Sequence, residues 1–168
     1  MRDAGMMPPP AVHMLMDDLD PPYVGYVSCR PFYRGADAVQ AIARLGTLPA
    51  ALYATRLVFG WEHADLMTAL EMPGDPFPTA LVTVEATFTG HTLSWYPLDI
   101  TWGPRGSVGV PTVRPTWGVP VVHDDTRLPA PVEAALARWR ALSKADIEKT
   151  ATKLQRDGYH VRLVDPPA

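Results

Sequence analysis

Proline sets the strongest limit on what this chain can fold into. Nineteen of its 168 residues are proline, about twice the share of roughly 5% that is usual in proteins. Each proline fixes the backbone angle φ and removes an amide donor, so it is poorly tolerated inside helices and central strands. These groups of prolines therefore predict connecting loops with only short helices and strands between them, at positions 8–10, 21–22, 73–78, 111–120, 129–131 and 166–167.

The segments between the proline groups have the patterns of both strands and helices. Two β-rich runs, 80–88 and 92–102, flank Thr89-Gly90-His91 and predict a β-hairpin. Apolar residues at helical spacing predict helices, and β-branched runs predict strands. Helices are expected at 37–45 (with Gly46 as its C-cap), 62–71, 129–142 and 143–157, further strands at 23–29, 55–61, 119–122 and 159–164, and a long loop at 103–120.

The fold class that these patterns predict is α+β. We expect a small mixed or antiparallel sheet with a central β-hairpin, packed by about three or four helices. Residues 1–20 hold three prolines and the acidic run Asp17-Asp18-Leu19-Asp20, which predicts a flexible acidic arm. Residues 21–168 are expected to form a single α+β domain, because their length and apolar content suit one folded core.

The lack of recognisable targeting signals and the net charge both limit the location and the partners that we expect. The early prolines interrupt any signal peptide, and no apolar run reaches the roughly 18 residues of a membrane span, so we expect a cytoplasmic chain without membrane contact. A net charge of −3 argues against general nucleic-acid binding. Residues 1–126 hold 7 Lys and Arg against 13 Asp and Glu, whereas residues 127–168 hold 8 against 5. Nucleic-acid contact through the basic C-terminal helix is therefore a weaker alternative, carried by Lys144, Lys149, Lys153 and Arg156.

The segment Trp61-Glu62-His63-Ala64-Asp65 is the candidate for metal chemistry. On an extended backbone His63 and Asp65 would share one face and could present two ligands to a divalent cation. This pair supports an alternative hypothesis, a divalent-metal-dependent hydrolase. The simpler interpretation is an acidic helix start that favours the helix dipole. A third metal ligand would have to come from Asp17, Asp18, Asp20 or His123-Asp124-Asp125.

Cys29, the single cysteine, is followed by Arg30 and Arg34 where a predicted strand leads into a helix. A thiolate beside arginines at a helix N-terminus could attack phosphate, and the arrangement is similar to the phosphatase loop of cysteine phosphatases. That loop needs an arginine six positions after the cysteine, where this sequence has Gly35. The sequence therefore predicts a buried structural cysteine, with Arg30 and Arg34 as candidates for binding an anion.

No catalytic or cofactor motif is present, so the sequence favours a non-enzymatic protein without a cofactor. Trp102 and Trp117 flank the Gly- and Pro-rich segment 103–120, and tryptophan is a frequent hot spot of protein interfaces. We therefore expect an accessory module that binds another protein of unknown identity through Trp102 and Trp117. Self-association into a homo-oligomer is a further option.

Overall fold

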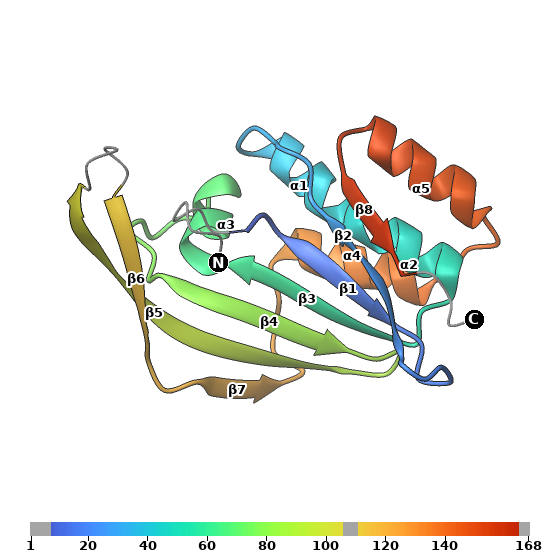
Figure 1. The fold of residues 1–168 in the computed structure, drawn as a ribbon, viewed down its shortest axis with the longest axis horizontal. Coiled ribbons are helices and arrows are strands. Elements are labelled where there is room, and N and C mark those ends of the chain that lie inside the picture. The colour runs from blue at the N-terminus through green and yellow to red at the C-terminus, as the bar shows by residue number, and fades with distance from the viewer. Residues whose placement is uncertain (1–7, 106–110, 165–168) are drawn as a thin grey trace.

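The computed structural model describes residues 8–105 and 111–164. Within them the chain forms an eight-stranded sheet, five α-helices and one 3-10 helix (Figure 1). In chain order these are β1 (Ala11–Leu15), β2 (Tyr23–Ser28), α1 (Ala36–Ala43), the 3-10 helix η1 (Arg44–Gly46), α2 (Thr47–Leu52), β3 (Arg56–Glu62), α3 (His63–Ala69), β4 (Ala80–Ala86), β5 (His91–Arg105), β6 (Pro111–Trp117), β7 (Val121–Asp124), α4 (Ala130–Arg140), α5 (Ile147–Arg156) and β8 (His160–Leu163).

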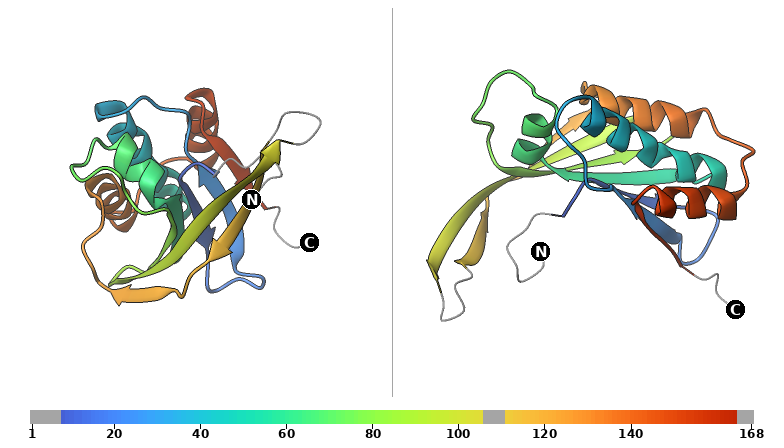
Figure 2. Two further views of the ribbon diagram at one scale, coloured as in Figure 1. Left: turned by 90° about the vertical axis from the view of Figure 1, so that its left-hand side faces the viewer. Right: turned by 90° about the horizontal axis from the view of Figure 1, so that it is seen from above.

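The sheet has the strand order β6-β5-β4-β3-β1-β2-β8, and β7 pairs with β5. Every pairing between described strands is antiparallel, which confirms the predicted α+β class. The helices are gathered over one face of the sheet, and the β5–β6 hairpin extends beyond them (Figure 2). No helix in the described ranges is long and apolar enough to cross a membrane.

One face of the sheet carries the core. In β1 the side chains of Val12 and Met14 are fully buried, whereas His13 between them is exposed. The same alternation buries Leu57, Phe59 and Trp61 of β3 beneath the helices. Strand side chains point alternately to the two faces, so these residues define an inner face that packs on the helices and an outer face without them.

The predicted β-hairpin is formed by β4 and β5, and its register aligns apolar residues across the inner face. Val82 pairs with Trp95 across the hairpin and with Trp61 on the other side. Trp95 in turn pairs with Val121 of β7. The result is one row of large apolar side chains, Trp61–Val82–Trp95–Val121, that runs from the middle of the sheet to its edge.

The expectation of a flexible arm over residues 1–20 is wrong for Ala11–Leu15. This segment is β1, which pairs with β2 on one side and with β3 on the other. Burial of Val12 and Met14 explains why it is held there, because each buried aliphatic side chain contributes about 1.5–3 kcal/mol. The first described strand is therefore an interior strand of the sheet.

The long loop expected at 103–120 is also not what the structure shows. β5 continues to Arg105, and Pro111–Trp117 forms β6, which pairs with it. Proline is tolerated in an edge strand, where its missing amide donor costs no ladder hydrogen bond. Only the connection at Gly118–Pro120, before β7, remains a loop among the described residues of this segment.

Two helix boundaries differ from expectation. Gly46 does not end the helix as a C-cap, because the chain continues through η1 into α2, and Gly46 itself lies against the backbone of Ala135 in α4. The last helix begins at Ile147 instead of near Ser143, because the Asp146 carboxylate accepts the amide hydrogen of Lys149 and caps it.

Candidate functional site

The acidic start of α3 is explained by Glu62. Its side chain is buried and accepts hydrogen bonds from the amides of Ala64, Asp65 and Ala80 at 3.1, 2.6 and 3.1 Å. This carboxylate therefore caps the helix and ties its first turn to the start of β4. The structure thus supports the helix-capping interpretation of this segment.

His63 and Asp65 lie in the walls of different cavities. His63 lines a cavity on the inner face of the sheet, whereas Asp65 lines a second one, of about 400 Å³, together with Cys29 and Arg30. Among the described residues, no three His, Cys, Asp or Glu side chains are grouped so that they could hold a metal ion. The third ligand that the metal hypothesis requires is therefore not found in that part of the chain.

Arg30 and Arg34 have different surroundings. The Arg30 guanidinium pairs with the Asp37 carboxylate and also donates to the carbonyl of Pro31, so it braces the turn that leads into α1. Arg34 is exposed. Burial raises the pKa of the Cys29 thiol to about 12, so this cysteine is a protonated core residue at neutral pH.

Trp117 lies at the end of β6 and is 49% exposed. Val119, Val121 and Val122 follow it with exposed fractions of 84%, 46% and 59%. We call these four residues the edge strip, because they follow the outer edge of the sheet along β6 and β7. The second predicted tryptophan, Trp102, has its backbone in β5, but its side chain lies outside the described part of the structure.

The inner-face cavity has a volume of about 650 Å³ and is mainly apolar. Trp61, Val82 and Trp95 belong to the cross-strand row described above, and helix α3 contributes His63 and Met67. The opposite wall is the segment Thr126–Pro131, which leads into α4. The remaining lining residues are Val39, Leu70, Met72, Leu93 and His123.

The ionisable side chains in this cavity are few, and none of them is acidic. They are His63, His123 and Arg127. The His63 ring packs against the Trp95 ring with their centroids 4.4 Å apart, and burial lowers the pKa of this imidazole. His63 is therefore neutral at pH 7, and Arg127 is the permanent positive charge of the cavity.

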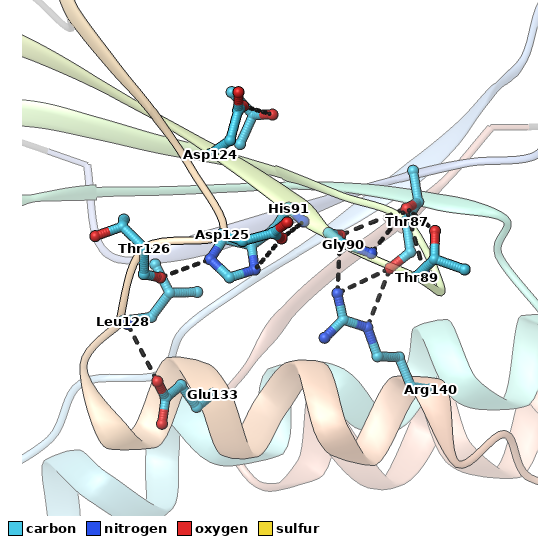
Figure 3. Close-up of polar contacts among 11 residues, drawn as sticks. Thr87, Thr89, Gly90, His91, Asp124, Asp125, Thr126, Leu128, Glu133 and Arg140 are labelled. Carbon is cyan, nitrogen blue, oxygen red and sulfur yellow. Dashed lines mark hydrogen bonds and ion pairs between the residues drawn. The ribbon is translucent and has the colours of Figure 1, made fainter.

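A set of hydrogen bonds fixes the wall segment Thr126–Pro131 (Figure 3). The His91 ring donates through Nε2 to the carbonyl of Thr126 at 2.7 Å, and the His91 amide donates to the Asp125 carboxylate at 2.9 Å. On the neighbouring turn, Arg140 of α4 donates to the carbonyls of Thr87 and Gly90. β5, the hairpin turn and α4 are thereby held around one side of the cavity.

The basic residues of the C-terminal region lie on the exposed surface. Lys144, Lys149, Lys153 and Arg156 are all exposed, and the last three lie along α5. This placement agrees with a solvated helix surface.

Comparison with protein-family models, curated proteins and solved structures finds no match for this chain. The function is therefore inferred from the edge strip and the inner-face cavity themselves.

Proposed function

We propose that this chain is a non-enzymatic module that binds another protein through the edge strip. The observation that carries this proposal is the exposure of Trp117, Val119, Val121 and Val122 within six consecutive residues. Contiguous exposed apolar side chains mark interaction surfaces. Half-exposed tryptophan is also the residue type most able to supply binding energy when a partner covers it.

The chemistry around the strip indicates the kind of partner. Asp99, Asp124 and Asp125 are exposed beside it, so a partner with an apolar centre and basic flanking residues is complementary. Pro111, Pro115 and Pro120 lack the amide hydrogen that an added strand would need. The contact is therefore expected through side chains and not through extension of the sheet.

The experiment compares Trp117→Ala with Tyr33→Ala. Tyr33 is 86% exposed in the connection before α1 and provides a matched loss of an exposed aromatic ring elsewhere. A photo-crosslinking residue placed at Val119 identifies the partner. We expect the protein crosslinked at Val119 to be bound by the wild type and Tyr33→Ala, and its affinity for Trp117→Ala to fall about 30-fold or more, as for a hot spot of at least 2 kcal/mol.

The melting temperature and the oligomeric state of the wild type and the variants are measured as well. Trp117→Ala should stay folded with a melting temperature close to that of the wild type, since Trp117 is 49% exposed. Unfolding of this variant, or equal partner affinity in all three proteins, would contradict the proposal. A wild-type dimer that Trp117→Ala converts to a monomer would identify the partner as a second copy of the chain.

A further inference from the structure

The inner-face cavity has the size and lining of a small-molecule site. Its volume of about 650 Å³ lies within the range of roughly 300–1,000 Å³ that is typical for ligand pockets. The space is larger than one anchoring side chain of a protein partner would fill. Met72 and Val39 at its rim are exposed, so the cavity is open to solvent there. Its occupant is thus expected to be a separate small molecule.

The lining determines the chemistry of that molecule. Trp61, Trp95 and Met67 offer flat and flexible apolar surfaces for an aromatic or aliphatic body. Arg127 offers a fixed positive charge, and no described residue forms an ion pair with it. In a chain whose net charge is −3, a cavity lined by the exposed Arg127 and by no carboxylate favours a negatively charged ligand.

Trp61 adds an independent observation. Its indole Nε1 is buried and is the one buried side-chain nitrogen or oxygen in the described ranges without a hydrogen-bond partner. An unpaired buried donor is destabilising. A movement of Trp61 on ligand binding could bring this donor to an acceptor, and its N–H signal therefore reports on the cavity.

We propose that the inner-face cavity binds an amphipathic organic anion, with its apolar body against Trp61 and Trp95 and its carboxylate or sulfonate near Arg127. This site is separate in function from the edge strip, although the two adjoin where Trp95 pairs with Val121. The wall that carries Arg127 is held in place by His91, which acts as a positioning residue.

Two fluorescent probes test the charge requirement. 8-Anilinonaphthalene-1-sulfonate and N-phenyl-1-naphthylamine share one aromatic body, and only the first carries a sulfonate. We expect both to bind the folded wild type. Arg127→Gln should weaken the anionic probe about three- to tenfold and leave the neutral probe unchanged. Arg138→Gln removes the same charge from an exposed position of α4 that does not line this cavity, and it should change neither affinity.

Nuclear magnetic resonance locates the site without any substitution. On titration of the wild type with decanoate, the indole N–H signals of Trp61 and Trp95 should shift. The Trp139 signal should stay constant, because its N–H donates to the carbonyl of Ala54 in the core.

Four results would overturn the proposal: no binding of either probe, equal effects of Arg127→Gln on both probes, equal effects of Arg127→Gln and Arg138→Gln, or constant Trp61 and Trp95 signals. Trp117→Ala should leave the affinity for the anionic probe unchanged, and loss of binding in that variant would place the probe on the edge strip instead. Failure of the cavity proposal is thereby separated from failure of the protein-binding proposal.

Discussion

Replacing Gly46 by alanine should strongly destabilise the protein. A methyl group on Gly46 would lie 2.0 Å from the carbonyl oxygen of Ala135 and 2.8 Å from its carbonyl carbon, whereas Cβ atoms essentially never come within 3.0 Å of such atoms. Relieving the first contact requires η1 and α4 to separate by at least 1.0 Å, the difference between 3.0 and 2.0 Å. The contacting group is backbone, so no side chain can rotate away.

The loss of stability follows from the core residues that α4 contributes. Val132, Leu136 and Trp139 are at most 2% exposed, so a displacement of α4 disturbs several core contacts together. Overpacking of this kind costs about 1–3 kcal/mol, and we expect the upper end, near 3 kcal/mol. For a domain of this length that corresponds to a fall in Tm of about 6–12 °C. The φ angle of Gly46 is −74°, an ordinary value for alanine, so steric contact alone is tested.

Gly60→Ala is the matched control. The nearest atom to a methyl group there is the carbonyl oxygen of Val82, at 4.0 Å, which is ordinary contact. Alanine in a strand also avoids the backbone entropy cost of glycine, about 0.5–1 kcal/mol, so stability should stay equal or rise slightly. Thermal and urea unfolding of both variants give the comparison. A Gly46→Ala protein that melts within 2 °C of the wild type, on the scale of roughly 2–4 °C per kcal/mol, would refute the reasoning.

Three further changes probe the surroundings of the cavity. Glu62→Gln should lower the free energy of unfolding, measured by urea titration, by about 1–3 kcal/mol, because the amide cannot accept all three backbone hydrogen bonds. The control Glu85→Gln, at an exposed ion pair, should lower it by less than about 1 kcal/mol. Because burial lowers the pKa of His63 below its ordinary 6.5, the unfolded chain binds the proton more readily, and stability should fall as the pH drops below 6.5. His63→Gln should make this fall smaller between pH 7.5 and pH 5, and an unchanged pH profile would contradict the assignment. His91→Ala should lower the free energy of unfolding by about 1 kcal/mol and weaken the binding of 8-anilinonaphthalene-1-sulfonate, because the segment Thr126–Pro131 loses its hydrogen bond to the His91 ring. Unchanged probe affinity would show that other contacts hold this segment.

Local patterns in the sequence were sufficient to predict several helices and strands. The β-hairpin at 80–102 was predictable because a glycine turn lies between two β-rich runs. The strands at 23–29 and 55–61 and the helix at 129–142 follow from residue type and spacing, and the structure confirms each within a few residues. In all of these the information lies within one continuous stretch of the sequence.

Elements whose stability comes from distant partners were missed. β1 is five residues long and is stabilised by β2 and by β3, whose first residue follows more than forty residues later. β6 contains two prolines, which in isolation indicate a loop and are accommodated only because the strand lies at an edge. α2 follows Gly46, whose role in the close approach of η1 to α4 cannot be seen without Ala135.

The inner-face cavity was missed for a related reason. Its lining comes from α1, β3, α3 and the residues after it, the β4–β5 hairpin, β7, the segment before α4 and the start of α4, so no short motif contains it. The expected turn at Thr89-Gly90-His91 would place Val82 opposite Leu98, whereas the turn lies at residues 87–90 and places Val82 opposite Trp95. The pairing of Trp61 with Val82, which completes the floor, required the position of β3.

The position of β1 bears on the order in which this protein can assemble during synthesis. β1 and β2, the first two described strands, pair with each other, and β3 pairs on one side of this unit while β8, the last described strand, pairs on the other. Contacts between such distant segments are slow to form because a long loop must close. Until residues 160–163 pair with β2, the outer edge of β2 therefore has no strand beside it.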